Sequence, residues 1–169
     1  VTTQQSYARM SGIIEDCDPA RALDDAVRLN SSSFDRHGIV VVRDYAEVPK
    51  VALDKQKLIQ ILVNLIKNAK DSLVEGSSLE RTLTLRTYVR DDGLAIEVCD
   101  TGVGIARENL TRIFSHGFTT KKSGHGFGLH SCANAASEMG GSLAVRSDGP
   151  GKGATFTLEL PFAPVEVQA

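Results

Sequence analysis

Hydrophobic residues recur along this chain with two different spacings, which together predict three helices and five strands. Apolar positions three and four residues apart indicate helices at about residues 18–37, 54–74 and 128–139. Runs that are β-branched or that alternate between apolar and polar residues indicate strands at residues 39–42, 82–90, 94–99, 143–147 and 154–160. Because the two kinds of element are interspersed, we expect an α+β fold, a two-layer α/β sandwich with helices on one face of a single sheet.

Residues at the ends of these segments support the division. Asp18 caps free backbone N–H groups and Pro19 fits a first helical turn, so the pair suits a helix start. Asp91-Asp92-Gly93 is a hairpin turn signal between two predicted strands. Pro49 indicates a connector before the second helix, and Gly76 follows that helix.

The second predicted helix carries a narrow polar stripe beside its apolar face. With Asn64 at zero on a helical wheel, Asn68 falls near +40° and Asp71 near −20°, at about 100° per residue. Gln60 extends the stripe by one turn. Such a stripe can merely solvate or cap the helix, although Glu and Lys would do so more favourably. Alternatively, its oxygens can complete the shell of a hydrated Mg²⁺ that holds phosphate groups.

Two glycine-rich segments follow. The first, residues 100–105, places Asp100 at a strand end, where a carboxylate can accept a hydrogen bond from an exocyclic amine such as that of adenine. Glycines at alternate positions after it allow the backbone to approach a ligand closely, although each segment alone is also compatible with a simple turn. The second, residues 124–128, directly precedes the third helix, whose N-terminus suits phosphate binding. Neither segment is a GxGxxG or P-loop motif.

Composition and charge narrow the classes of function. The 169 residues are 41% hydrophobic and 24% charged, as in a globular domain with one core. The net charge is −2 and the basic residues are dispersed, so we expect no nucleic-acid partner and no direct membrane contact. The odd set of Cys17, Cys99 and Cys132 has no CxxC spacing, which favours a reducing compartment, and we expect a cytoplasmic domain even if its parent protein is membrane-anchored.

Taken in order, these motifs resemble the ATP-binding domain of histidine kinases, in the superfamily that includes the gyrase-type ATPases. The resemblance covers about residues 18–161 and implies a Bergerat-type ATP-binding fold, with a mixed five-stranded sheet and three helices on one face. Five boxes carry it, named N, G1, F, G2 and the terminal glycine motif, at residues 64–69, 100–104, 113–121, 124–129 and 151–156.

The resemblance implies ATP and Mg²⁺ as ligands and gives roles to matching positions. Asn68 is expected to bind Mg²⁺, Asn64 and Lys121 to act at the phosphates, and Asp100 to recognise the adenine amine with Thr155 beside it. The expected nucleotide contacts are Asn64, Asn68, Asp71, Asp100, Gly102, Gly104, Ile105, Thr119, Thr120, Lys121, Lys122, Gly124, His125, Gly126, Phe127, Gly128, Leu129 and Thr155. The aromatic rings of the F box, Phe114 and Phe118, are expected to anchor the intervening lid by packing.

Two positions bear on the branch of the superfamily and on the reaction. Asp71 stands where many sensor kinases have a lysine. A carboxylate at this position resembles the nitrogen-regulator-like kinases and the gyrase-type branches, and it implies an indirect or water-mediated role at the metal. Gyrase-type ATPases carry a glutamate at the Asn64 position as general base, whereas an amide cannot take a proton at neutral pH. We therefore expect transfer to an acceptor. The alternatives are a gyrase-type ATPase, a serine protein kinase of the same superfamily and a domain that has lost ATP binding.

The family also implies partners outside this chain. The acceptor histidine is expected on a separate dimerisation domain, from which a response-regulator receiver domain takes the phosphate. None of the chain's histidines, at positions 37, 116, 125 and 130, lies in the family's acceptor pattern, so the chain should bind ATP without efficient self-phosphorylation. We expect residues 1–15 to end a dimerisation-domain helix or linker, 16–163 to form the catalytic domain and 164–169 to be a tail.

Overall fold

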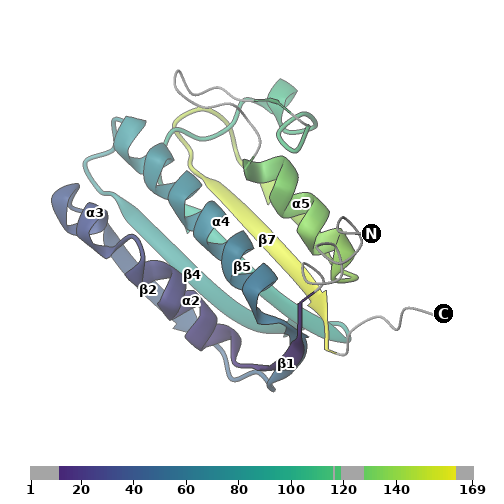
Figure 1. Cartoon of the computed structure of the whole chain (residues 1–169). Coiled ribbons are helices and arrows are strands. Elements are labelled where there is room, and N and C mark those ends of the chain that lie inside the picture. Colours follow the sequence, from purple (N-terminus) through teal and green to yellow (C-terminus); the bar gives the residue numbers. More distant parts are fainter. Residues whose placement is uncertain (1–11, 116, 119–127, 163–169) are drawn as a thin grey trace, which may run out of the picture.

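The computed structural model of the chain describes residues 12–115, 117–118 and 128–162. Its centre is a five-stranded sheet with the strand order β2-β4-β5-β7-β6 (Figure 1). The β2 and β4 strands are parallel and the other neighbours are antiparallel, so the sheet is mixed as expected. The strands are β2 (Val40–Tyr45), β4 (Thr82–Arg90), β5 (Gly93–Asp100), β6 (Ser142–Arg146) and β7 (Ala154–Pro161).

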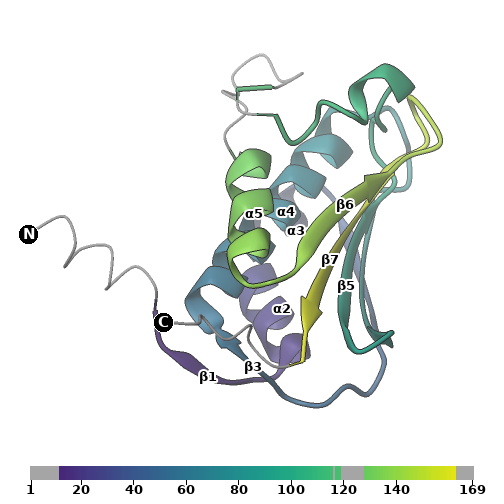
Figure 2. The ribbon, with the colours of Figure 1, turned by 90° about the vertical axis from the view of Figure 1, so that its right-hand side faces the viewer.

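Helices cover one face of this sheet. Figures 1 and 2 show α2 (Pro19–Arg28), α4 (Lys55–Glu75) and α5 (Gly128–Glu138) side by side on that face, with α4 in the middle. Among the described residues, no element is packed on the opposite face (Figure 2). The two-layer sandwich with three helices on one face is therefore confirmed. Within the same part of the chain, no helix combines the length and apolar character needed to cross a bilayer.

The central helix α4 follows directly from its sequence. It begins after Asp54, whose Oδ1 accepts a hydrogen bond from the Lys57 N–H at 3.2 Å, and it ends where the Gly76 N–H bonds to the Ser72 carbonyl at 3.0 Å. Its buried residues repeat at helical spacing and pack between α2, α5 and the sheet: Leu58, Ile61, Leu62, Leu65, Ile66, Ala69 and Leu73. These contacts hold the C-terminal half of α4 over the end of β5.

The N-terminal third differs from the sequence-based prediction in two respects. The first predicted helix is interrupted at Leu29 and Asn30, so that α2 is followed by a separate short helix, α3 (Ser31–Arg36). A small two-stranded sheet pairs β1 (Ile14–Cys17) with β3 (Val51–Asp54), and neither strand was predicted.

Two of the β1 residues, 14 and 15, fall in the segment that was predicted to be helix or linker. Strands of four residues carry too little alternation to be recognised in a sequence, and only their mutual pairing defines them.

Candidate functional site

Three segments meet at one end of the sheet. The β5 strand ends there at Asp100, α4 ends beside it, and α5 begins at the same end, as Figures 1 and 2 show. The loop at residues 101–105 leaves β5 and passes the C-terminal turn of α4, where the Val103 N–H bonds to the Ser72 carbonyl at 3.3 Å. The N, G1 and G2 boxes of the sequence are thus brought together, as far as they are described.

The Asp100 side chain is buried, and within the described part of the chain only one of its two oxygens is paired. It is 3% exposed, and its Oδ1 accepts hydrogen bonds from the Gly102 N–H at 2.9 Å and the Ser72 hydroxyl at 3.1 Å. Its Oδ2 is buried and has no hydrogen-bond partner among the described residues. An unpaired buried carboxylate oxygen costs about 1–3 kcal/mol or more, so it calls for a donor that the described residues do not supply.

The environment of Asp100 also raises the pKa of its carboxyl group above 3.8. Burial is the largest cause, because it disfavours the charged form. The Gly102 N–H, the Ser72 hydroxyl and, least of the three, the Ala154 backbone N–H oppose the rise, because they favour the charged form. A buried acid with a raised pKa at a strand end is a common feature of binding sites.

The glycines of the loop are required by contacts within the chain. A Cβ on Gly102 would lie 2.2 Å from the Ser72 Oγ, and a Cβ on Gly104, whose φ is +71°, would lie 2.1 Å from the Gly149 carbonyl oxygen. A Cβ on Gly153 would meet the Asp100 carbonyl oxygen at 2.0 Å. Gly102 and Gly104 were expected to let the backbone approach a ligand. The structure shows in addition that the three glycines let α4, the loop and the turn before β7 pack closely around Asp100.

The polar stripe of α4 lies on a partly exposed face beside the core. Asn64, Asn68 and Asp71 are all of intermediate burial, and the Lys70 Nζ lies 3.2 Å from the Asp71 Oδ1. Burial raises the pKa of the Cys132 thiol on α5 to about 11, and a hydrogen bond with the Asn64 side chain opposes that rise. Asn64 therefore stands at the junction of α4 and α5, close to where α5 begins.

The donors on this stripe fit magnesium better than a transition metal. Among the described residues, no group of three His, Cys, Asp or Glu side chains could hold a metal ion. Asn68 offers an amide oxygen and Asp71 a carboxylate, and both are hard oxygen donors. Mg²⁺ is bound in this manner, by one or two protein oxygens together with waters and substrate phosphates.

The G2 side of the site is described only from Gly128 onward. A Cβ on Gly128 would meet no atom of the described residues within 4 Å. Leu129 packs against the core. The remaining predicted contacts of the lid lie outside the described residues: Thr119, Thr120, Lys121, Lys122, Gly124, His125, Gly126 and Phe127.

The F box is anchored by packing, as its aromatic residues predicted. The Phe114 ring meets the core residue Phe156 edge to face, with centroids 6.2 Å apart, and the Arg112 guanidinium lies 4.9 Å from the Phe118 ring centroid. His130 of α5 holds the same segment, since its Nδ1 lies 3.0 Å from the Phe114 carbonyl oxygen. These contacts fix the described part of the F box against the rest of the domain.

Thr155 does not stand where the resemblance implied. In the pairing of β5 with β7, Ala154 lies opposite Asp100 and Thr155 lies opposite Cys99. The Thr155 hydroxyl bonds to the Cys99 Sγ at 3.2 Å. Because successive side chains of a strand point to opposite faces, Thr155 lies on the face of the sheet away from Asp100. The β7 residue beside Asp100 is therefore Ala154 and not Thr155.

Two serines that were not predicted as site residues hold the site together. Ser72 bonds to Asp100, as described above. Ser147 accepts a hydrogen bond from the Ile105 N–H at 3.0 Å and donates one to the Gly153 carbonyl at 2.6 Å. On the wheel of α4, Ser72 falls near +80°, inside a sector that is otherwise apolar, at about 100° per residue. A polar residue at an apolar position was the available signal.

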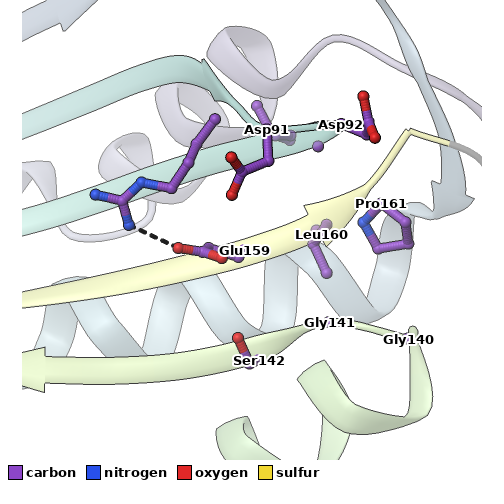
Figure 3. A pocket seen from close by; sticks show the side chains of 11 residues that line it. Asp91, Asp92, Gly140, Gly141, Ser142, Glu159, Leu160 and Pro161 are labelled. Carbon is purple, nitrogen blue, oxygen red and sulfur yellow. Dashed lines mark hydrogen bonds and ion pairs between the residues drawn. The ribbon is translucent and has the colours of Figure 1, made fainter.

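A hollow at the other end of the sheet is separate from this site. Figure 3 shows it between the β4–β5 hairpin, the turn that follows α5 and the end of β7. Its rim carries Asp91, Asp92 and Glu159, and the Glu159 carboxylate is already paired with the Arg90 guanidinium at 2.7 Å. It lies at the opposite end of β5 from Asp100 and contains no residue of the N, G1, F, G2 or terminal glycine boxes.

Comparisons with known proteins agree with this geometry. A family described as histidine kinase-, DNA gyrase B-, and HSP90-like ATPase matches residues 53–164. The sensor histidine kinase ZraS of Escherichia coli (strain K12) is 37% identical over 114 residues, which cover 68% of this chain and 23% of that protein. The sensor protein FixL of Bradyrhizobium diazoefficiens is 35% identical over 113 residues, which cover 67% of this chain and 22% of that protein. The chain thus spans less than a quarter of the length of these relatives.

Solved structures give the same result. Full-length ShkA in complex with AMPPNP matches with a TM-score of 0.78 and 27% identity, covering 91% of this chain and 32% of that one. The nucleotide-free catalytic domain of the histidine kinase ThkA matches with a TM-score of 0.78 and 23% identity, covering 89% of this chain and 97% of that one. Because the identity to ThkA is only 23%, that match supports the fold alone.

Proposed function

Because this chain belongs to the family of histidine kinase-, DNA gyrase B- and HSP90-like ATPases, we propose that it is the catalytic domain of a sensor histidine kinase. In this proposal it binds Mg-ATP and presents the γ-phosphate to a histidine on a dimerisation domain outside this chain. A response-regulator receiver domain then takes the phosphate. The observation that carries the proposal is the Asp100 Oδ2, which is buried, unpaired among the described residues and suited to the adenine amine.

The residues of the site have distinct tasks in this reaction. Asp100 selects the base, and Asn68, with Asp71 beside it, would hold Mg²⁺, which offsets charge on the phosphates when bound. The backbone N–H groups at the start of α5 face the phosphates and favour their negative charge. Lys121 of the lid adds a cation at the transferred group. Phosphoryl transfer needs little covalent chemistry from the protein, so such positioning and charge neutralisation supply most of the catalysis.

Asn64 favours transfer to a protein acceptor over hydrolysis. Its amide cannot accept a proton at neutral pH, so it cannot activate a water molecule as a carboxylate does. Its contact with Cys132 also ties it to the packed junction of α4 and α5. The base that assists the attacking imidazole then belongs to the dimerisation domain. The gyrase-type ATPase has no specific observation in its favour at this position.

Labelled ATP tests the proposed function directly. The chain alone should bind an ATP analogue with Mg²⁺ in calorimetry, with a Kd in the micromolar range or weaker, corresponding to about −8 kcal/mol or less favourable. It should show almost no self-labelling, and it should produce acid-labile label on an added dimerisation domain of a sensor kinase. Strong acid-labile labelling of the isolated chain, or acid-stable label on the acceptor, would contradict the proposal. Steady-state hydrolysis that Asn64→Ala abolishes would favour the ATPase instead.

Lowering the pH should weaken ATP binding before ordinary surface aspartates titrate. Because the folded pKa of Asp100 is raised, the charged form that accepts the amine is lost as the pH falls through that raised value. The folding stability of the nucleotide-free protein depends on pH in the opposite direction. The contribution of Asp100 to that stability is fully present below pH 3.8, and it is lost as the pH rises through the pKa of the folded state.

Calorimetry between about pH 8 and pH 5 measures this dependence. Purine riboside triphosphate, which lacks the amine, serves as the control because its phosphates titrate like those of ATP. If the affinities for the two nucleotides fell equally as the pH is lowered, Asp100 would not contribute to the pH dependence of ATP binding.

A further inference from the structure

The Ser72 hydroxyl connects the end of α4 to the carboxylate of Asp100 across 28 positions of sequence. Its Oγ accepts a hydrogen bond from the Val103 N–H at 3.0 Å and donates one to the Asp100 Oδ1 at 3.1 Å. The direction of both bonds is fixed by chemistry, because a backbone N–H only donates and an ionised carboxylate only accepts. The single hydroxyl proton of Ser72 is therefore committed to Oδ1.

This commitment determines how the carboxylate is presented. Oδ1 receives two donors, the Ser72 hydroxyl and the Gly102 N–H at 2.9 Å, whereas Oδ2 receives none from the described residues. Rotation of the carboxylate out of this plane would break both bonds inside a buried site, where an unpaired donor is costly. Oδ2 is thus held as a fixed acceptor for a ligand.

The position of Ser72 is held just as firmly. Its carbonyl oxygen accepts the Gly76 N–H that ends the helix and a second bond from the Val103 N–H. The approach of the loop is so close that Gly102 has no room for a Cβ, which would lie 2.2 Å from the Ser72 Oγ. Ser72 also follows Asn68 by four residues, so the two side chains lie one turn apart on the same side of one helix.

We propose that Ser72 is a positioning residue for base recognition: it locks the Asp100 carboxylate so that Oδ2 faces the exocyclic amine of adenine. It also joins this acceptor rigidly to the face of α4 that carries Asn68. This role rests on the proposed function, because it concerns how the same site selects its nucleotide. Ser72 contributes to the discrimination between bases with and without a donor at that position, and only weakly to the binding of the phosphates.

The test compares two nucleotides in three proteins. Calorimetry with Mg²⁺ measures the affinities of ATP and of purine riboside triphosphate, which differs only in lacking the amine, for the wild-type chain, Ser72→Ala and Thr87→Val. Thr87 is the matched control, because its buried hydroxyl bonds to the Ala46 carbonyl at 3.2 Å, in the half of β4 away from the site. Thermal unfolding of each protein shows how much stability either hydroxyl contributes.

The wild-type chain should prefer ATP by about tenfold or more, as expected for a hydrogen bond to a charged group. Ser72→Ala should reduce that preference to about two- to threefold while the affinity for purine riboside triphosphate changes by less than about twofold. Thr87→Val should keep the wild-type preference whatever its melting temperature. A Ser72→Ala protein with the full wild-type preference would overturn the inference. Wild-type protein that binds neither nucleotide would overturn the proposed function, and the inference with it.

Discussion

Replacement of Asp100 by asparagine should lower the affinity for ATP by about 100-fold, the equivalent of about 3 kcal/mol. The loss exceeds that of one neutral hydrogen bond because the orientation of the new amide is dictated by its neighbours. The Ser72 hydroxyl and the Gly102 N–H both donate to the Oδ1 position, so the amide oxygen must occupy it. The amide NH₂ then takes the place of Oδ2 and opposes the adenine amine, donor against donor.

The same substitution should stabilise the nucleotide-free protein. Burial raises the pKa of Asp100, which means that the ionised form costs folding stability at neutral pH, and a neutral amide of equal size removes that cost. A gain of 1 kcal/mol corresponds to a rise in Tm of about 2–4 °C for a domain of this size. This opposition between stability and binding is expected where a charge is buried for a ligand.

Calorimetry with ATP and inosine triphosphate, together with thermal unfolding, checks both effects. Inosine presents an oxygen acceptor where adenine presents an amine, so Asp100→Asn should shift the preference towards inosine triphosphate. Asp54→Asn is the control, because Asp54 is a buried acid of similar exposure that caps α4 at the opposite end of the sheet. It should retain ATP binding and lose some stability. Wild-type ATP affinity in Asp100→Asn would refute this account of base recognition.

The second large effect is expected for Asn68→Ala. Removal of an oxygen donor from the metal site should lower the affinity for ATP in the presence of Mg²⁺ by about 10–100-fold. Substitution of residues that only orient metal ligands already costs this much, and a direct ligand should cost at least as much. Binding in the presence of a chelator, which measures the base and phosphate contacts alone, should change little. The diagnostic quantity is therefore the ratio of the affinities with and without Mg²⁺, measured by calorimetry.

Gln56→Ala provides the matched control for this prediction. Gln56 is another amide side chain of α4, exposed in the first turn and far along the helix from Asn68. Its removal should leave the Mg²⁺ enhancement at the wild-type level. Equal losses with and without Mg²⁺ in Asn68→Ala would instead assign Asn68 to direct contact with the nucleotide.

The main elements of the fold could be predicted from the sequence because their signals are local and long. The α4 helix repeats its apolar residues over 21 positions, and the structure ends it within a residue of Gly76. The hairpin at Asp91 and the strand end at Asp100 were likewise placed correctly, since turn residues and alternation are properties of neighbouring positions. Breaks and pairings that depend on distant partners, such as the interruption at Asn30 and the β1–β3 pair, were missed.

The sequence also supplied the residues of the candidate site, but it did not supply their arrangement. Periodicity placed Asn64, Asn68 and Asp71 on one side of a helix, and an acid followed by glycines indicated a binding loop. The sequence alone determined which residue types the site would contain. Only the tertiary structure decided that Ser72 pairs with Asp100, that Gly104 packs against Gly149 and that Ala154 takes the place expected of Thr155. The reason is physical: periodicity fixes the face on which a side chain lies, whereas register and close contact between distant segments are set by the packing of the whole domain.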